Sequence, residues 1–518
     1  MKITQCLRRN ALIKAEEKAL LCGTEALTWR ALTDRSARLA GVLQALGLQR
    51  GESVAMLADS CLEYFEFHFG VLWAGGMMVP LNTRLSDPEL NEILSDARAQ
   101  ILIAAEPYLG RARELAESCE SLRLIEIDGE RGAENYHELV KEQPPIDDVE
   151  QDSSEVAALI YTGGTTGRAK GVALSHGNIV ANALVAMNTM EFREDMVYLH
   201  ATPLFHTAGS GRVFSTTVAG GSGVILPKFD ETKVLETVAE HHITHLLLVP
   251  TMINRLVNHP AFHSTDLSSL TNISYGAAIM PEALLRLVME KLPGVRFTQS
   301  YGMTELSPSA AYLPPEYHTL EGPKAGKLTS IGVPVHSAEI RIADESDREV
   351  ARRTVGEIQV RGPMVMQGYW NQPELSAETL KGGWMHTGDA AYMDEDGFIF
   401  LVDRFKDMII SGGENVYSGE VENALYEHQA VKECAVIGVP DDDWGERVHA
   451  IVVLHPGASA NADELIAHCR ERIAGYKIPR SISFREQALP LSATNKIHKP
   501  TLREEYLNAN SDARPNDG

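Results

Sequence analysis

Short apolar runs alternate with segments of helical spacing from Val156 to about Gly302, and this alternation restricts the fold more than any other feature of the sequence. The runs that predict strands are 156–161, 197–201, 245–249 and 273–275. Between them, the triplets Val234, Leu235, Val238 and Ile253, Leu256, Val257 each share one helix face. Strands that alternate with helices are typical of βα units on a mainly parallel sheet. We therefore predict an α/β fold.

The first 150 residues carry a similar pattern. Positions 32, 36, 39, 43 and 46 fall on one helical stripe, Gly47 can end that helix, and residues 53–57 follow as a strand. The chain has 518 residues, whereas single hydrophobic cores stop growing at roughly 250 to 300 residues. We therefore expect more than one domain, and we expect the first 150 residues to join the architecture of the larger one.

The pattern changes near residue 390. Residues 391–402 predict a β-hairpin around the turn Asp394–Gly397. Beyond it the expected elements are a helix from Ser418, a strand at 435–439 and a helix from Asp463. The sequence thus predicts a large N-terminal domain of mainly parallel sheets with helices over residues 1–403. A small, mobile α+β C-terminal domain is predicted over residues 404–518.

The composition argues against several classes of protein. The formal net charge of −24 is spread along the chain, which argues against general nucleic-acid binding. No stretch approaches the roughly 18 apolar residues of a membrane span, and the N-terminus has no apolar region typical of a signal peptide. The six cysteines form no CxxC pairs, which argues against a disulfide framework or structural zinc. We predict a cytoplasmic protein, and nothing in the sequence predicts its oligomeric state.

A glycine-rich run, YTGGTTGRAKG at 161–171, directly follows a predicted strand. Its glycines let backbone N–H groups turn toward an anion, its threonine hydroxyls add donors, and Lys170 supplies a mobile cation. The run therefore predicts phosphate binding. It is not a Walker loop, because two residues separate Gly167 from Lys170. Taken alone, a glycine-rich surface loop is the alternative.

This loop resembles that of the adenylate-forming superfamily, which includes acyl-CoA synthetases, aryl-CoA ligases, luciferases and peptide-synthetase adenylation domains. Further segments match in the expected order across most of the chain. They are PLFH at 203–206, GAA at 276–278, YGMTE at 301–305, TGD at 387–389 and DRFKDMIISGGENV at 403–416. Each segment alone has an ordinary structural alternative, whereas the ordered set is highly specific. The chain most resembles the acyl-CoA synthetases and aryl-CoA ligases.

The resemblance implies an ATP site. Residues expected to contact ATP or AMP are Thr162, Gly163, Gly164, Thr165, Thr166, Gly167, Lys170, Gly276, Ala277, Ala278, Tyr301, Gly302, Met303, Asp389 and Arg404. Tyr301 would stack on adenine, while Asp389, expected in a surface-accessible turn, and Arg404 would reach the ribose. Thr304 would contact the α-phosphate and Glu305 would bind Mg²⁺. These roles are chemically reasonable, because an aromatic face suits a purine and a carboxylate suits a hard cation.

The resemblance also names catalytic residues and a hinge. The catalytic set is Lys496, Thr304, Glu305 and His206. Lys496 would cap the adenylation site, and His206 would gate or orient the acyl carbonyl, with a core histidine as its alternative. Lys406 would be the hinge about which the small domain rotates.

Coenzyme A is implied by a second group of residues in the C-terminal part. Ser411, Gly412 and Gly413 resemble the backbone strip along a pantetheine tunnel. Trp444 and Lys477 stand where aryl-CoA ligases contact the CoA nucleotide. Ordinary packing for the tryptophan and a solvated lysine are the alternatives.

The chain departs from the superfamily pattern at three positions. Gly163 replaces a usual serine and Ala169 a usual proline. The missing hydroxyl at Gly163 leaves open which loop atoms bind pyrophosphate. Asn495 stands where most members have glycine beside the lysine, although asparagine tolerates left-handed backbone better than most residues.

These features predict an AMP-forming carboxylic acid:CoA ligase that uses ATP, Mg²⁺ and coenzyme A. A carboxylate is a poor acyl donor, so its attack on the α-phosphate of ATP would form acyl-AMP and release pyrophosphate. The CoA thiol would then attack the acyl carbonyl. One arrangement cannot serve both steps well, and the resemblance implies that the small domain swings about Lys406, withdraws Lys496 and brings up Gly412 and Gly413.

The acid itself is left open between a fatty and an aryl acid. The small residues at 208–211 suggest a roomy, apolar pocket. Arg212 is expected on the helix surface, with contact to a second carboxylate as the alternative. Malonate-type ligases place an arginine where this chain has Ser300, so dicarboxylates rank lower.

Three other functions compete with a CoA ligase. An adenylation enzyme that loads amino acids onto a carrier protein would need an aspartate in the pocket segment, and residues 205–212 contain none. A light-producing oxygenase is disfavoured because the sequence ends without a peroxisomal tripeptide. An adenylate-binding protein without ligase activity is disfavoured by the joint presence of Lys170, Thr304, Glu305, Asp389, Arg404 and Lys496.

Overall fold

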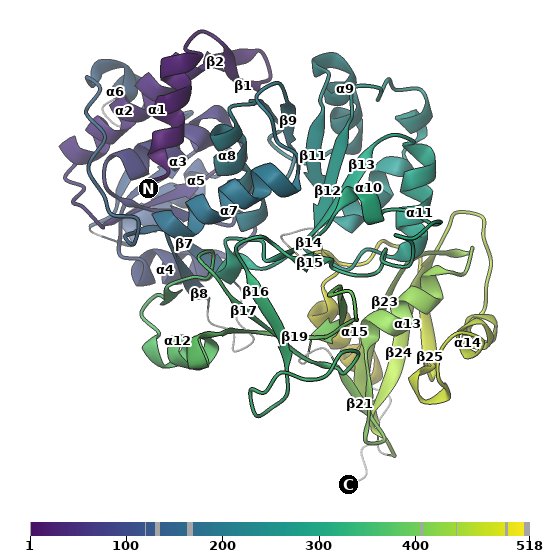
Figure 1. Ribbon diagram of the computed structural model, residues 1–518. Coiled ribbons are helices and arrows are strands. Elements are labelled where there is room, and N and C mark those ends of the chain that lie inside the picture. The colour runs from purple at the N-terminus through teal and green to yellow at the C-terminus, as the bar shows by residue number, and fades with distance from the viewer. Residues whose placement is uncertain are drawn as a thin grey trace.

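The computed structural model describes residues 2–119, 121–129, 135–162, 169–404, 408–441, 443–492 and 496–511. Their helices and strands form four sheets with helices packed on them (Figure 1). Two large, mainly parallel sheets occupy the upper part of Figure 1, and two smaller, mostly antiparallel sheets lie below them. The predicted α/β class, with mainly parallel sheets in the N-terminal part, is confirmed.

A seven-stranded sheet contains most of the first 175 residues. Its order is β18 (Gly368–Tyr369), β8 (Lys170–Ser175), β7 (Val156–Thr162), β4 (Met77–Pro80), β3 (Ser53–Leu57), β5 (Ala99–Ala104) and β6 (Arg123–Glu126). The accompanying helices are α2 (Trp29–Ala45), α3 (Leu62–Trp73), α4 (Asp87–Asp96), α5 (Leu109–Glu117) and α6 (Tyr136–Glu142). The pairs from β7 to β6 are parallel, while β8 and β18 are antiparallel additions.

A nine-stranded sheet holds the middle of the chain. Its order is β15 (Val333–Pro334), β14 (Ala311–Leu313), β13 (Arg296–Tyr301), β12 (Asn272–Gly276), β11 (His245–Leu248), β9 (Val197–His200), β10 (Ser222–Ile225), β1 (Lys18–Cys22) and β2 (Glu25–Thr28). The helices are α1 (Thr4–Ile13), α7 (His176–Thr189), α8 (Thr207–Ala219), α9 (Glu231–His241), α10 (Pro250–Val257) and α11 (Glu282–Lys291). The first 150 residues therefore build largely a second sheet, while β1 and β2 extend this one at its edge.

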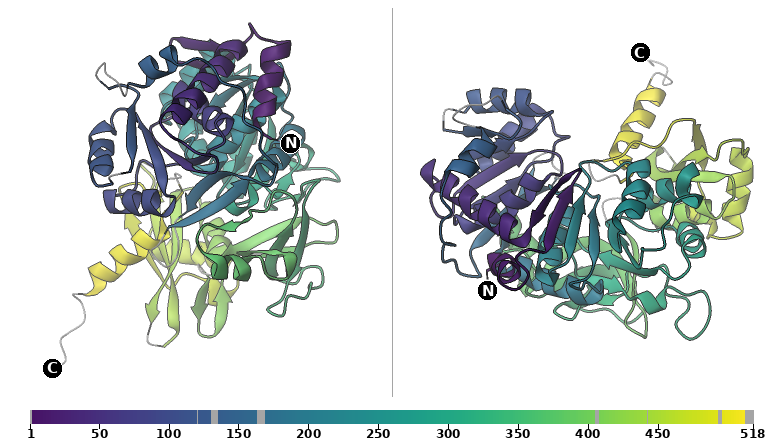
Figure 2. Two further views of the ribbon diagram at one scale, coloured as in Figure 1. Left: turned by 90° about the vertical axis from the view of Figure 1, so that its left-hand side faces the viewer. Right: turned by 90° about the horizontal axis from the view of Figure 1, so that it is seen from above.

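One hydrophobic core joins the two large sheets, which lie side by side in Figure 2. It takes side chains from the seven-stranded sheet, from β1 and β10, and from α2, α3, α7 and α8. All residues of α3 are buried. This follows from its sequence, because a helix that is apolar nearly all round cannot face water on any side. The packing fixes α8 between the sheets, where it can reach the site described below.

The C-terminal part contains the two smaller sheets. A four-stranded sheet has the order β16 (Glu339–Ala343), β17 (Gly356–Arg361), β19 (Met385–Met393) and β20 (Ile399–Arg404), with α12 (Pro373–Thr379) nearby. A five-stranded sheet has β22 (Glu414–Val416), β21 (Ile409–Ser411), β24 (Gly445–Leu454) and β23 (Val431–Asp441), and β25 (Ser481–Arg485) pairs with β24. Its helices are α13 (Ser418–Tyr426), α14 (Ala462–Arg470) and α15 (Lys499–Ser511).

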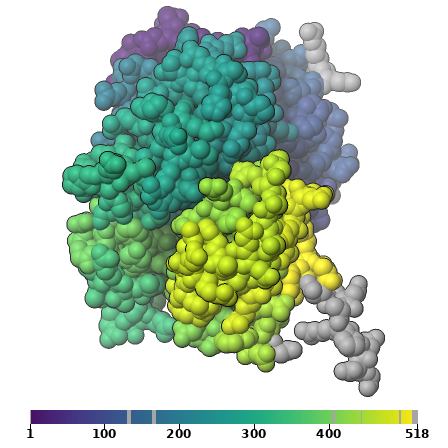
Figure 3. All heavy atoms as spheres, turned by 90° about the vertical axis from the view of Figure 1, so that its right-hand side faces the viewer, coloured from purple at the N-terminus to yellow at the C-terminus, as the bar shows by residue number. Residues whose placement is uncertain are grey.

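The five-stranded sheet and its helices form a separate lobe, coloured yellow-green and yellow in Figure 3. Its two hydrophobic clusters draw only on residues from Ile409 onward. The small C-terminal domain is thereby confirmed, whereas its boundary after residue 403 remains a prediction. Among the described residues, no helix is both long and apolar enough to cross a membrane.

Candidate active site

The glycine-rich run closes a β-hairpin. β7 ends at Thr162, β8 begins at Lys170, and these two residues are opposite one another in antiparallel register. The intervening predicted contacts, Gly163, Gly164, Thr165, Thr166 and Gly167, lie outside the described residues. The Nζ atom of Lys170 lies 5.4 Å from the ring centre of Tyr369, which is within cation–π range.

Tyr369 also contacts the predicted metal ligand. Its hydroxyl donates a 2.8 Å hydrogen bond to Oε1 of the buried Glu305. Burial and then the Glu305 carboxylate raise the pKa of Tyr369, so its hydroxyl stays protonated and remains a donor. This tyrosine was not predicted from sequence, because 64 positions separate it from Glu305.

Glu305 fits a magnesium ion that arrives with a nucleotide. The described residues contain no group of three or more His, Cys, Asp or Glu side chains that could hold a metal by themselves. Mg²⁺ in phosphoryl-transfer sites is usually held by one or two carboxylates together with phosphate oxygens and water. A single buried carboxylate beside Lys170 and Tyr369 matches that donor set.

The YGMTE turn packs tightly against the start of α8. A Cβ atom at Gly302 would lie only 1.7 Å from the carbonyl oxygen of Pro308, so glycine is required there. Met303 precedes the short 3-10 helix Thr304–Leu306. The hydroxyl of Thr207, the first residue of α8, donates a 2.8 Å hydrogen bond to Oγ1 of Thr304. The turn and α8 therefore hold Thr304 in a defined position.

The predicted adenine-flanking segment follows β12. Gly276 ends this strand opposite Ser300 of β13, and a Cβ there would lie 2.1 Å from the Ser300 carbonyl oxygen. Ala277 has a φ of 65°, which turns the chain out of the sheet toward Ala278. Carboxyl ends of neighbouring parallel strands meet at one edge, where α/β proteins bind ligands. The segment and Tyr301 lie together at this edge.

Tyr301 and Asp389 are joined directly. The Tyr301 hydroxyl donates a 2.7 Å hydrogen bond to Oδ2 of Asp389, and both side chains are buried. The expectation of a surface-accessible turn at Asp389 is wrong, because this residue lies inside β19. Glycine in the sequence TGD favours a turn. Gly388 does have a left-handed φ of 71°, but it adopts this angle within the strand.

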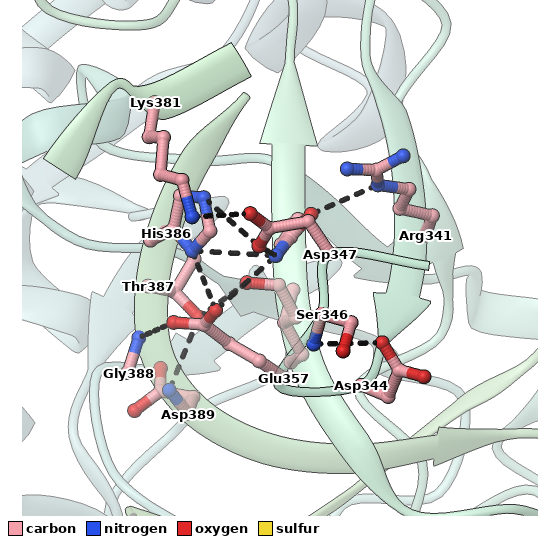
Figure 4. A network of polar contacts seen from close by, with 12 residues as sticks. Arg341, Asp344, Ser346, Asp347, Glu357, Lys381, His386, Thr387, Gly388 and Asp389 are labelled. Atoms are coloured by element: carbon pink, nitrogen blue, oxygen red, sulfur yellow. Dashed lines mark hydrogen bonds and ion pairs between the residues drawn. The ribbon is translucent and has the colours of Figure 1, made fainter. Parts of the chain in front are cut away.

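A polar network holds the TGD segment in place (Figure 4). Glu357 of β17 accepts hydrogen bonds from the Gly388 N–H at 3.0 Å and from His386 Nδ1 at 2.7 Å. The Thr387 hydroxyl donates to the Ile358 carbonyl oxygen at 2.8 Å and accepts from the Asp389 N–H at 3.1 Å. Because these bonds fix the backbone on both sides, the Asp389 carboxylate is held toward Tyr301.

Asp389→Asn is expected to raise the KM for ATP by about tenfold or more, because a hydrogen bond to a charged acceptor is worth about 1.5 to 3 kcal/mol. The amide oxygen can still accept from Tyr301, so the melting temperature should change little. Steady-state kinetics and thermal unfolding check both points. Tyr301→Phe is the matched control, since it removes the hydrogen bond between Tyr301 and Asp389, which the asparagine variant keeps, and leaves both the carboxylate and the ring in place. An equal rise in KM in both variants would mean that Asp389 acts only through Tyr301.

His206 and Lys496 are brought together although they are 290 positions apart in sequence. His206 directly precedes α8, and its Nε2 atom is buried without a hydrogen-bond partner among the described residues. Burial, and then the positive charges of Lys496 and Arg84, lower the pKa of His206 to about 3. The imidazole is therefore neutral at neutral pH.

Arg84 connects the small C-terminal lobe to the large part of the molecule. Its Nη1 donates a 2.9 Å hydrogen bond to the Ser492 carbonyl oxygen. Ser492 and Lys496 exchange two further bonds, from Ser492 N–H to the Lys496 carbonyl at 2.7 Å and from Lys496 N–H to Ser492 Oγ at 3.3 Å. Sequence reasoning missed Arg84. Its contact places Lys496 near the site in the arrangement that the structure adopts.

The predicted hinge is only partly described. Arg404 ends β20 opposite Asp389, but its side chain and the whole of Lys406 lie outside the described residues. The neighbouring Asp403 is buried, and its Oδ2 accepts from the Ser418 N–H and hydroxyl at 2.6 and 2.8 Å. Since Ser418 begins α13, these bonds tie the end of β20 to the first helix of the C-terminal lobe.

The predicted CoA residues fall into two places. Ser411, Gly412 and Trp444 lie together, since the Gly412 N–H donates a 2.9 Å bond to the Trp444 carbonyl oxygen. A Cβ at Gly412, where φ is 63°, would lie 2.4 Å from the indole, whereas Gly413, with φ of 83°, faces open space.

The second place is the surface of α13. Lys477 donates to both Glu420 oxygens at 2.7 Å, so its ammonium is paired in this arrangement.

Trp444, which lies in the first place, is 40% exposed and stacks with the Arg480 guanidinium at 3.9 Å from the ring centre. An exposed indole beside a guanidinium can accept a flat aromatic group.

Comparison with known proteins identifies the family. The AMP-binding enzyme family matches residues 7–370, and its C-terminal domain matches residues 420–496. A feruloyl-CoA synthase from Amycolatopsis sp is 40% identical over 500 residues, covering 96% of this chain and 98% of the relative. A long-chain-fatty-acid–CoA ligase from Bacillus subtilis is 36% identical over 92% of this chain and 90% of its own. The chain therefore belongs to the AMP-binding enzyme family.

A solved structure supports the same assignment. An anthranilate–CoA ligase in complex with anthranoyl-AMP matches with a TM-score of 0.92 and 28% identity, covering 99% of this chain and 98% of that chain. The predicted family, fold and ATP-dependent acid–CoA ligase class are confirmed by these matches. The roles of individual residues were not tested by them and remain predictions.

Proposed function

We propose that this chain joins a fatty or aryl carboxylic acid to coenzyme A through an acyl-AMP intermediate. The observation that carries the proposal is the hydrogen bond from Arg84 to Ser492, which pairs with Lys496 and so holds the lysine turn of the C-terminal lobe against the large part of the molecule. Lys496 comes from the C-terminal lobe, whereas His206 adjoins the Thr207–Thr304 hydrogen bond. A cation, a hydroxyl and a neutral imidazole thus meet where the acid carboxylate and the α-phosphate of ATP would react.

In the first step the ionised acid attacks the α-phosphate, so no general base is needed. Negative charge builds on the phosphoryl oxygens, and Lys496, Thr304 and Lys170 would stabilise it. Magnesium on Glu305 would supply further positive charge at the phosphates. His206, being neutral, can orient the acid without adding a second cation beside Lys496.

Adenine and ribose recognition would come from the edge where β12 and β13 end. Tyr301 presents a ring held by Asp389, and Gly276, Ala277 and Ala278 would lie along the adenine. Asp389 and Arg404 would bind the ribose hydroxyls. Bound this way, the nucleotide would direct its α-phosphate toward Thr304.

The second step requires a path for the CoA thiol. We propose that the domain formed by residues 404–518 rotates about Lys406, so that Lys496 leaves the site. Ser411, Gly412 and Gly413 would then line the pantetheine, with Trp444 and Lys477 near the nucleotide of CoA. Rotation would break the contact between Arg84 and Ser492, which would make that contact specific to the first step.

We also propose a cytoplasmic location. All six cysteines are free, as is usual in a reducing compartment.

A product assay tests the reaction. With ATP, Mg²⁺, CoA and a panel of fatty and aryl acids, AMP and pyrophosphate are expected in a one-to-one ratio with the thioester. ADP and phosphate as stoichiometric products would contradict the proposal. Pyrophosphate release that does not lead to a CoA thioester would instead support a stand-alone adenylation enzyme that loads a carrier protein. An adenylate-binding protein without ligase activity would release neither product.

A further inference from the structure

Helix α8 carries a buried cation that the mechanism above does not use. Arg212 is 1% exposed, so the expectation that it lies on the helix surface is wrong. Arg212 follows Ala208 by four residues on one face of α8, and Ala208 packs against the cluster that contains Tyr198 of β9. After burial, the charge of Arg212 also contributes to the pKa values of Tyr198 and His200. Arginine is almost never buried to this degree unless it is paired.

The guanidinium lacks a partner in the described part of the chain. Its Nε and Nη1 atoms are buried without a hydrogen bond, and none of the described carboxylates forms an ion pair with it. Burial lowers the pKa of Arg212, but a guanidinium remains protonated in proteins. A buried charge without an opposite charge is strongly unfavourable, so an external acceptor would be bound favourably.

The polar groups around Arg212 are also unsatisfied. The Tyr198 hydroxyl is buried without a hydrogen-bond partner among the described residues, and so is His200 Nε2. Burial raises the pKa of Tyr198 and lowers that of His200 to about 3, so both are neutral. One cation and two neutral polar groups therefore meet in one buried place.

Arg212 shares helix α8 with Thr207, which contacts the candidate active site. Thr207, in the same helix, contacts Thr304, and five residues place the backbone of Arg212 about 8 Å further along the helix axis and about 140° around it. Gly211 faces Pro308, which follows the YGMTE turn, with a Cβ-to-Cδ distance of 3.1 Å. The rise along α8 from Thr207 to Arg212 is about the length of a cinnamate or an eight-carbon chain.

Small side chains border this interval on both sides. Residues 208–211 of α8 are alanine, glycine, serine and glycine. On the sheet, the strand register places Ser274 and Thr298 on the same face as Tyr198, and both are buried. The buried Leu247 of β11 shares this face between Tyr198 and Ser274, so the short residues are those of α8, β12 and β13. Short side chains there are what a bound acyl group would require.

We propose that Arg212, assisted by Tyr198, binds a second oxygen acceptor on the acid substrate, about 8 Å from the carboxylate that reacts. The substrate class is then a carboxylic acid with a distal hydroxyl, carbonyl or carboxylate, and an ionised oxygen should bind best because it neutralises the guanidinium. This inference rests on the proposed function. Ser300 does not oppose it, since Ser300 lies on β13 and Arg212 approaches from α8.

Matched acids and Arg212→Met test the inference. The pairs are octanoate with octanedioate, and cinnamate with 4-hydroxycinnamate and 4-carboxycinnamate. In the wild type, at least one oxygen-bearing acid should exceed its parent in kcat/KM by about tenfold. Arg212→Met should lower kcat/KM for that acid by about 30-fold or more, and for octanoate and cinnamate by less than about threefold. The hydroxyl and carboxylate arms distinguish a neutral acceptor from an ionised one.

Stability separates recognition from a structural role. Arg212→Met should not lower the melting temperature, because an apolar side chain replaces an unpaired buried charge. Arg35→Met is the matched control: Arg35 Nε lies 2.5 Å from the fully buried Glu66, so its loss should lower the melting temperature and leave the acid preference unchanged. A large loss of stability in Arg212→Met, or an equal loss of rate for all acids, would overturn the inference.

The wild-type acid profile separates this inference from the proposed function. If parent acids and oxygen-bearing acids give AMP at similar kcat/KM, the inference fails while the ligase activity stands. If no acid in the panel gives AMP, the proposed function fails for this panel, and acid-induced thermal shifts without ATP decide the inference. A larger shift with octanedioate than with octanoate, abolished in Arg212→Met, would support it, and equal shifts would overturn it.

Discussion

Lys496→Ala is expected to slow acyl-adenylate formation by about 10²- to 10³-fold, or about 2.7 to 4 kcal/mol, which is the cost of one aimed donor at a transition state. Arg84 donates a hydrogen bond to the Ser492 carbonyl oxygen, and Ser492 pairs with Lys496, so the structure holds the lysine turn at the face of the large part that carries Arg84. Acyl-AMP supplied from outside should still be converted to acyl-CoA at nearly the wild-type rate. That selectivity is the important part of the prediction.

The two half-reactions can be measured separately. Exchange of labelled pyrophosphate into ATP reports the first, and thioester formation from synthetic acyl-AMP and CoA reports the second. Lys432→Ala, which removes a half-exposed lysine from β23 of the same lobe, should change neither rate by more than about threefold. If Lys496→Ala slows both half-reactions equally, Lys496 serves the fold or both steps, and rotation of the small domain loses its main support.

Local patterns predicted the elements of the fold well. The strand at 53–57 and the start of the helix at Ser418 are found as predicted, and the strand at 245–249 is shorter by one residue. These segments succeed because hydrophobic period and capping act over a few residues. The second large sheet was not predicted, since the pairing of strands far apart in sequence has no local pattern.

The site was predictable where a motif brings its own backbone geometry. Gly276 and Gly302 are required by close approaches to neighbouring carbonyl groups, so the glycines themselves indicate tight turns. Contacts between distant segments were missed. The hydrogen bond from Arg84 to Ser492 spans 408 positions, and no periodicity connects them.

Asp389 and Arg212 were placed wrongly for a shared reason. Charged residues are normally exposed, so a surface position is the natural expectation for each. Asp389 is buried because the Tyr301 hydroxyl donates a hydrogen bond to it. Arg212 is buried without any such partner in the described residues, so the two exceptions differ in kind. The first has a partner within the protein through one of its oxygens, and the second is the basis of the proposed recognition of the acid.

Gly413→Leu is expected to have the opposite effect to Lys496→Ala. Adenylation should continue at a near wild-type rate, while conversion of acyl-AMP to acyl-CoA should fall by about 10²-fold, which is the typical cost of misplacing a reactant by about 1 Å. A Cβ at Gly413 meets nothing within 4 Å in this arrangement, so the leucine should not disturb the first step by contact. It should obstruct the pantetheine only when the lobe rotates.

Backbone strain must be separated from obstruction. Gly413 has a φ of 83°, so any side chain there is disfavoured by about 1 to 2 kcal/mol. Gly457 offers a matched control in the same lobe, with a φ of 79° and open space around its Cβ position. Gly457→Leu should show the same small loss of stability and leave both half-reactions intact. If both leucine variants slow thioester formation equally, strain in the lobe explains the loss and Gly413 does not line the CoA path.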